Sequence, residues 1–129
     1  MQVFRTFISL VQEIKENSKQ LNSISEVIFQ AVDSSKAQKI TSLPVSHLTS
    51  VTDYMIICTG SSSRHMRHLA ETAIEAVNEH GFEVLSTEGM NSDEWIIVDC
   101  GDAVLHVMSN EAREFYHLEG LWDIKESPE

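Results

Sequence analysis

Residues 94–108 read Glu-Trp-Ile-Ile-Val-Asp-Cys-Gly-Asp-Ala-Val-Leu-His-Val-Met. Two apolar segments of strand length flank Gly101-Asp102, and a two-residue loop with glycine first is typical of a type II′ hairpin turn. We therefore predict two antiparallel strands, over 94–100 and 103–108, joined by that turn. The register that follows sets three pairs of residues opposite one another: Cys100 with Ala103, Ile97 with His106, and Trp95 with Met108.

The two faces of this hairpin differ in chemistry because side chains alternate along a strand. One face is wholly aliphatic and comprises Ile96, Val98, Leu105 and Val107. The other face comprises Trp95, Ile97, Asp99, Val104, His106 and Met108. The aliphatic face is expected to lie in the core, whereas a large aromatic ring beside a carboxylate and an imidazole is typical of a binding surface. The alternative is that a helix covers the second face and that Asp99 simply pairs with His106.

The segments before the hairpin predict an α/β domain. Residues 54–59 form a continuous apolar run, so we expect a strand buried on both faces. A strand over 39–45 would lie at a sheet edge or end at Pro44, because proline cannot donate a hydrogen bond to a sheet. A short strand is expected over 83–86, with polar loops over 47–52 and 88–93. These strands and the helices below predict a mixed sheet of about five strands packed with helices.

Helical spacing of apolar residues predicts helices over 4–14, 23–35, 63–80 and 110–116. Ser23 and Glu26 form the pattern of a capping box at the start of the second helix. Gly81 is expected to stop the third helix, and Asn110 to cap the fourth.

Composition indicates one globular domain, since the 129 residues are 42% hydrophobic and 22% charged. No apolar run approaches the roughly 18–20 residues needed to cross a bilayer, and the N-terminal stretch lacks the features of a signal peptide. Cys58 and Cys100 each lie inside an apolar run without metal-type spacing, so we expect reduced core residues. The chain is therefore expected to be a soluble cytoplasmic protein that does not bind membranes.

The charge of −11 is concentrated in the second part of the chain. Residues 83–129 carry twelve acidic residues against only Arg113 and Lys125. Nucleic-acid binding draws most of its affinity from Lys and Arg at phosphates, so direct contact with nucleic acid is not expected to dominate. A basic protein is the natural complement, although the charge could also serve only solubility.

Two other patterns admit functional and structural interpretations. The turn from Gly60 through Ser61 to Arg64 could bind an anion, but the same pattern is typical of an ordinary helix N-cap, which we favour. His65 and His68 have no partner at a metal-enzyme spacing, so we expect no metal site and no cofactor. No catalytic constellation is apparent, and we expect a protein that is not an enzyme.

Four motifs follow one another along the chain. They are Thr52-Asp53-Tyr54-Met55-Ile56-Ile57-Cys58-Thr59-Gly60 running into Ser62-Ser63-Arg64-His65, Glu88-Gly89 followed by Trp95-Ile96-Ile97-Val98-Asp99, Gly101-Asp102-Ala103-Val104-Leu105-His106-Val107, and Arg113-Glu114-Phe115-Tyr116-His117-Leu118-Glu119 with Leu121-Trp122. Taken together, these motifs resemble those of the ribosomal silencing factors, the RsfS or Iojap-related proteins. The resemblance covers about 100 of the 129 residues, from Ser23 to Trp122. It divides the chain into an N-terminal amphipathic helical extension over 1–22, the silencing factor domain over 23–122, and an acidic tail over 123–129.

The resemblance implies an α/β fold reminiscent of nucleotidyltransferases without their catalytic carboxylates. It also implies a protein that binds the fourteenth protein of the large ribosomal subunit, blocks joining with the small subunit and represses translation when nutrients are scarce. Separately, the resemblance implies that the chain forms a homodimer. Six residues fall on family motif positions and are the expected partner contacts: Asp53, Tyr54, Trp95, Asp99, Asp102 and His106. The alternative is a nucleotidyltransferase-like enzyme with Gly60-Ser61 at a phosphate and Asp99 and Asp102 at a metal.

Overall fold

The computed structural model describes residues 23–123. The helix predicted over 4–14, with the rest of the extension over 1–22, lies outside the described residues. The same holds for the tail beyond residue 123.

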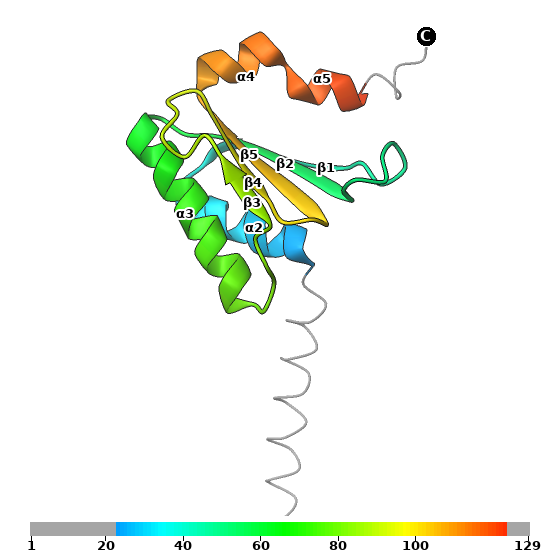
Figure 1. Cartoon of the computed structure of the whole chain (residues 1–129). Helices are drawn as coiled ribbons and strands as arrows, with labels where there is room; N and C mark the ends of the chain where they lie inside the picture. The colour runs from blue at the N-terminus through cyan, green and yellow to red at the C-terminus, as the bar shows by residue number, and fades with distance from the viewer. Residues whose placement is uncertain (1–22, 124–129) are drawn as a thin grey trace, which may run out of the picture.

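A five-stranded mixed sheet forms the centre of the domain, as predicted (Figure 1). Its strands are β1 (Gln38–Pro44), β2 (Tyr54–Thr59), β3 (Ser86–Glu88), β4 (Trp95–Asp99) and β5 (Ala103–Met108). They lie in the order β1-β2-β5-β4-β3, with β2 and β5 parallel and the other neighbours antiparallel. The parallel pair at the centre is joined by the long connection that contains α3, as parallel strands require.

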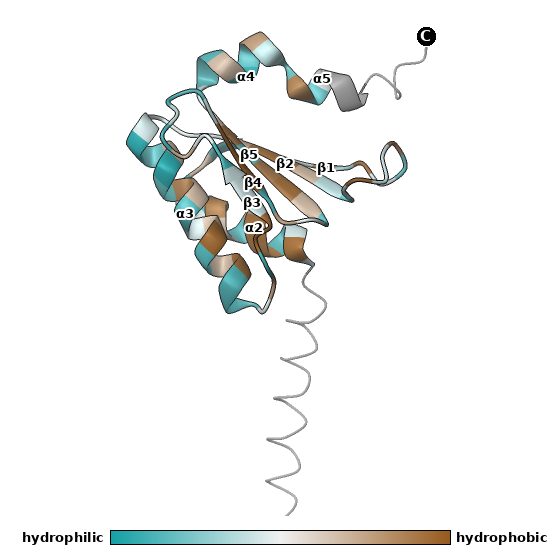
Figure 2. Cartoon of the chain, viewed as in Figure 1, coloured by the Kyte–Doolittle hydropathy of each residue, from teal (hydrophilic) through white to brown (hydrophobic). Residues whose placement is uncertain are grey.

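Two pairs of helices lie on opposite sides of the sheet (Figure 1). They are α2 (Ile24–Ser34) with α3 (Ser63–Glu79) on one side, and α4 (Asn110–Tyr116) with α5 (Leu118–Asp123) on the other. Strongly hydrophobic residues gather on the central strands and on the sheet-facing parts of α2 and α3 (Figure 2). The larger core lies there, and it includes Ile28, Met66 and Leu69 from the helices.

The strand β2, between β1 and β5, contacts a core on each of its faces, which confirms the expectation for an apolar run of this kind. Its residues Ile56 and Cys58 belong to the larger core. Met55 and Ile57 belong to a second, smaller core on the side of α4 and α5. The other buried members of that smaller core are Val45, Met108, Ala112 and Leu118.

The predicted hairpin register is confirmed. Trp95 lies opposite Met108, and Ile97 lies opposite His106. Gly101 has a φ of +83°, a conformation that glycine adopts without steric cost, and this agrees with its first position in a II′-type turn. The aliphatic face of the hairpin is fully buried: Ile96, Val98, Leu105 and Val107 are all 0% exposed and belong to the larger core.

Three of the predicted ends of helices and strands are also confirmed. The Ser23 hydroxyl accepts from Glu26 N–H at 3.3 Å, and the Glu26 carboxylate accepts from Ser23 N–H at 3.2 Å, which completes the capping box. Gly81, with a φ of +84°, follows the end of α3. The strand β1 lies at the sheet edge and ends at Pro44, as predicted.

Two boundary predictions were wrong, and one helix was not predicted. The third strand covers Ser86–Glu88 rather than 83–86, because its register is set by pairing with the short strand β4, where Ser86 lies opposite Asp99. The N-cap of α4 is Ser109 rather than Asn110, since the Ser109 hydroxyl accepts from Ala112 N–H at 3.1 Å. The helix α5 was not predicted at all.

Candidate docking surface

Trp95 and His106 form a hydrogen-bonded pair on the second face of the hairpin. The Trp95 indole N–H donates to His106 Nδ1 at 2.9 Å, with the ring centroids 5.8 Å apart. Trp95 is half-buried, whereas His106 is only 7% exposed. His106 therefore holds the indole ring in place from beneath, and a partner that touches Trp95 reaches His106 mainly through that ring.

The alternative pairing of Asp99 with His106 does not occur. The Asp99 carboxylate instead accepts from Gly101 N–H at 2.9 Å and so closes the hairpin turn. The alternative also expected a helix to cover this face of the hairpin. This is partly right, because α4 and α5 cover the end of the face near Met108. The face is thus divided into a covered part near Met108 and a half-exposed part that carries Ile97, Asp99 and Val104.

Burial lowers the pKa of His106 from its ordinary value of 6.5 to about 4. A charged imidazolium would lose its hydration in this environment, so the neutral form is favoured. The hydrogen bond requires the neutral form too, because Nδ1 can accept the indole proton only when it carries none itself. Trp95 therefore rests on a neutral histidine at physiological pH.

This burial predicts an acid-sensitive contribution to stability. The unfolded chain binds a proton at His106 near pH 6.5, whereas the folded chain does so only near pH 4. Stability is therefore lost as the pH falls between these values, by roughly 1.4 kcal/mol per pH unit at most. Urea denaturation of the wild type and of His106→Asn, measured between pH 7 and pH 5, should show a smaller loss in the variant. Identical pH dependence in the two proteins would mean that His106 does not titrate as its burial implies.

An aromatic row extends from Trp95 onto α4. The Trp95 and Tyr116 rings lie 4.9 Å apart, and the Tyr116 and Phe115 rings lie 5.0 Å apart in an edge-to-face arrangement. Tyr116 is 45% exposed and Phe115 is 80% exposed, which is unusual for side chains of this size. Phe115 and Tyr116 were not among the partner contacts predicted from the sequence. A signal for them was present in the sequence, since two adjacent aromatic residues lie on a short helix. In the structure this helix buries only Ala112 and Arg113.

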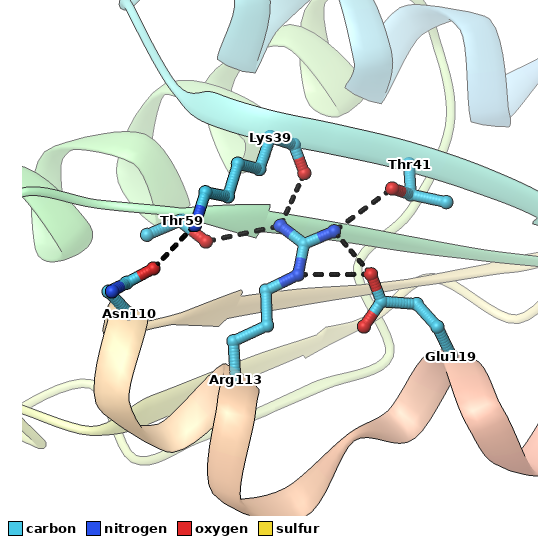
Figure 3. A network of polar contacts seen from close by, with 6 residues as sticks. All are labelled: Lys39, Thr41, Thr59, Asn110, Arg113 and Glu119. Atoms are coloured by element: carbon cyan, nitrogen blue, oxygen red, sulfur yellow. Dashed lines mark hydrogen bonds and ion pairs between the residues drawn. The ribbon is translucent and has the colours of Figure 1, made fainter.

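Arg113 fastens α4 and α5 to the sheet edge (Figure 3). The Arg113 side chain is only 9% exposed. Its guanidinium donates hydrogen bonds to Thr59 Oγ1 at 3.1 Å, to Thr41 Oγ1 at 2.9 Å and to the Lys39 carbonyl. It forms an ion pair with the Glu119 carboxylate at 2.6 Å. Four elements, β1, β2, α4 and α5, thus meet at one side chain, and this fixes the direction in which α4 presents its aromatic rings.

The hydrogen bond from Arg113 lowers the pKa of Glu119 below its ordinary value. The pair therefore stabilises the fold above the pKa of an unfolded glutamate and loses that contribution as the pH falls through the lower folded value. Beside the pair, Lys39 Nζ donates to Asn110 Oδ1 at 2.7 Å, which adds a further contact between β1 and α4 (Figure 3).

The remaining predicted contact residues lie at the opposite end of the hairpin from Trp95. Asp53 and Tyr54 both donate their backbone N–H to the Asp102 carbonyl at 3.0 Å, so these three residues are brought together. Asp99 lies on the same sheet face as Trp95 but four residues along β4, roughly 13 Å away. Tyr54 packs against the larger core, on the other side of the sheet from Trp95. A partner seated on Trp95 and Asp99 therefore approaches Asp53 and Asp102 at the rim but not the inner part of the Tyr54 ring.

The turn before α3 is an N-cap, as favoured from the sequence. The Ser62 hydroxyl accepts from His65 N–H at 3.0 Å. His65 Nδ1 accepts from Ser61 N–H at 3.0 Å, and its Nε2–H donates to the Ser35 carbonyl at 2.9 Å. His65 thus joins the start of α3 to the end of α2, and a phosphate would have to displace the imidazole to reach the Ser61 N–H.

Within residues 23–123, no three His, Cys, Asp or Glu side chains lie close enough together to hold a metal ion. Burial raises the pKa of Cys58 to about 12 and that of Cys100 to about 11, so both thiols remain protonated. In the same part of the chain, no helix is both long and apolar enough to cross a bilayer.

Comparison with known proteins agrees with this architecture. Residues 15–129 match the family model described as ribosomal silencing factor during starvation, RsfS. Ribosomal silencing factor RsfS of Haemophilus influenzae is 41% identical over 100 residues, which cover 78% of this chain and 98% of that relative. An Arabidopsis thaliana protein described as Iojap-related and mitochondrial is 30% identical over 97 residues, covering 71% of this chain and 52% of that relative.

The crystal structure of a Chromobacterium violaceum protein superposes with a TM-score of 0.75 at 38% identity, covering 77% of this chain and 82% of that one. The family model spans most of the chain, and the H. influenzae relative matches over nearly its whole length. The motif resemblance, the fold and all three comparisons agree, and the chain belongs to the ribosomal silencing factor family.

Proposed function

We propose that the chain represses translation by docking on the large ribosomal subunit, through its fourteenth ribosomal protein, and by blocking its joining with the small subunit when nutrients are limiting. Membership of the silencing factor family supports this function. In the structure, the observation that carries it is the aromatic row of Trp95, Tyr116 and Phe115, which lies partly exposed on an acidic domain. Tryptophan and tyrosine are enriched among the residues that dominate the binding energy of protein interfaces.

The chemistry of the surface favours a basic protein over RNA as the direct contact. The part of the chain that carries the aromatic row holds ten of the net negative charges, and an RNA backbone would be repelled by it. A basic protein is attracted by the same field, which raises the rate of encounter and fixes the orientation of docking. The protein would act in the cytoplasm, where the ribosomal subunits are.

Within this proposal the six predicted contact residues have different roles. Trp95 and Asp99 lie on the docking face, and the exposed Asp53 and Asp102 lie at its rim. His106 positions the Trp95 ring by accepting its indole N–H. Tyr54 is half-buried on the other side of the sheet, and its backbone N–H donates to the Asp102 carbonyl in the hairpin turn.

Sedimentation with purified subunits tests the function. The protein should travel with the large subunit only, and at saturation it should reduce the fraction of subunits that join. Equal binding to both subunits, or undiminished joining at saturating protein, would refute the proposal. Light scattering of the free protein tests the homodimer that the family resemblance implies, with a monomeric mass as the opposite result.

The proposed charge complementarity predicts that association depends on salt. If acidic side chains meet basic ones across the rim, the association rate should fall as ionic strength rises past about 0.15 M, where the screening length is about 8 Å. Stopped-flow measurement with labelled protein and large subunits between low and high salt would detect this. A rate that does not change with salt would place the interaction in apolar contacts alone.

A further inference from the structure

A surface hollow lies beside the aromatic row, between the loop that enters β4 and the helix α4. Its volume is about 600 Å³, and it is lined by Asp93, Glu94, Ser109, Glu111, Ala112, Phe115 and Tyr116. We call it the aromatic hollow. The Ser109 N–H donates to the Glu94 carbonyl at 2.9 Å, which holds the β4 loop and the start of α4 together at its floor.

The aromatic hollow leaves a large apolar surface in contact with water. Phe115 is 80% exposed and Tyr116 is 45% exposed, and the two rings stand at 89° to each other. No requirement of the fold explains this exposure, because α4 is anchored by the burial of Ala112 and by the Arg113 contacts. An exposed patch of this kind is typical of an interaction site.

The carboxylates around the rings decide which partner fits. Asp93, Glu94 and Glu111 line the hollow with exposed side chains, and none of them forms an ion pair with a side chain among residues 23–123. No Lys or Arg lines the hollow. Arg113 points beneath α4 toward the sheet, and Lys39 donates to Asn110 in the neighbouring hollow. The hollow is therefore negative and aromatic, without a cation of its own.

We infer that the aromatic hollow receives an arginine or lysine side chain of a basic partner protein. A cation over an aromatic face gains energy from the ring, and a guanidinium can also form two parallel hydrogen bonds to one carboxylate. The volume accommodates one long side chain together with part of the backbone that carries it. The inference rests on the proposed function only in that the basic ribosomal partner would supply the cation.

Titration with a minimal probe tests the hollow without the ribosome. N-acetyl-arginine amide should shift the amide signals of Glu111, Phe115 and Tyr116 in a saturable way in the NMR spectrum of the full chain. The citrulline analogue, which has the same shape and no charge, should not. Equal shifts with both probes would show an apolar hollow without charge selection and would overturn the inference.

Matched variants test whether the aromatic hollow contributes to large-subunit binding. Glu111→Gln should weaken arginine binding about 3-fold and large-subunit binding about 10-fold, and Phe115→Leu should have similar effects. Glu114→Gln, on the same helix but outside the hollow, should change neither. Thermal melts of all three variants identify any loss caused by unfolding.

The outcomes separate the inference from the proposed function. If the wild type binds the large subunit and the hollow variants bind equally well, the inference is wrong and the function stands. If arginine binds in the hollow but the protein does not bind the large subunit, the inference stands and the proposed function fails. If Phe115→Leu instead converts a dimer to a monomer, the hollow is an interface between two copies and the inference is overturned.

Discussion

Replacement of Arg113 by methionine is expected to lower the free energy of unfolding by about 3 kcal/mol, the lower end of the cost of breaking a buried ion pair, because the Glu119 side chain is 22% exposed. The substitution leaves the Glu119 carboxylate without its cation and removes the donor from Thr41 Oγ1 and Thr59 Oγ1. It would also free α4 from the sheet edge, so the aromatic row would lose its fixed position. Urea denaturation measures the first effect, and large-subunit binding measures the second.

Arg67→Met is the matched control for this prediction. Arg67 forms an ion pair with Glu71 on the surface of α3 at 3.3 Å, with both side chains more than half exposed. Water and salt screen such a pair, and its loss should cost less than about 1 kcal/mol. Similar losses in the two variants would mean that Arg113 contributes no more than a surface arginine.

Ile96→Ala and Trp95→Ala are expected to have opposite effects, although the two residues are neighbours. Ile96 is fully buried, and truncation should lower the free energy of unfolding by about 2–5 kcal/mol. Trp95→Ala should weaken binding to the large subunit by at least about 2 kcal/mol, close to 30-fold. These two measurements test the hairpin register, because a one-residue slip would exchange the faces.

The structure adds a moderate stability cost for Trp95→Ala that the sequence did not predict. Loss of the indole N–H leaves the buried His106 Nδ1 without its donor, which should cost about 1–3 kcal/mol. Thermal melts must therefore accompany the binding assay. If Trp95→Ala unfolds the domain while Ile96→Ala leaves its stability unchanged, the docking surface is wrongly assigned.

The sequence by itself determined the elements whose signals are local. The two apolar segments of strand length on either side of Gly101-Asp102, with glycine first in the turn, specified the hairpin and its register. The reciprocal bonds of Ser23 and Glu26 involve residues only three apart, so the capping box was readable from spacing alone. The apolar run of β2 predicted burial on both faces, because no polar residue interrupts it.

Only the tertiary structure decided which residues share the candidate docking surface. The contacts of Arg113 with Lys39 and Thr41 join residues more than seventy positions apart, and no local pattern encodes such a pairing. The boundary of β3 was likewise set by its partner strand and not by the apolar character of residues 84 and 85. The position of α4 placed Tyr116 beside Trp95, whereas sheet pairing turned Tyr54 to the opposite side. Local propensity acts over a few residues, but a surface is formed by long-range packing, and its members become neighbours only when the chain has folded.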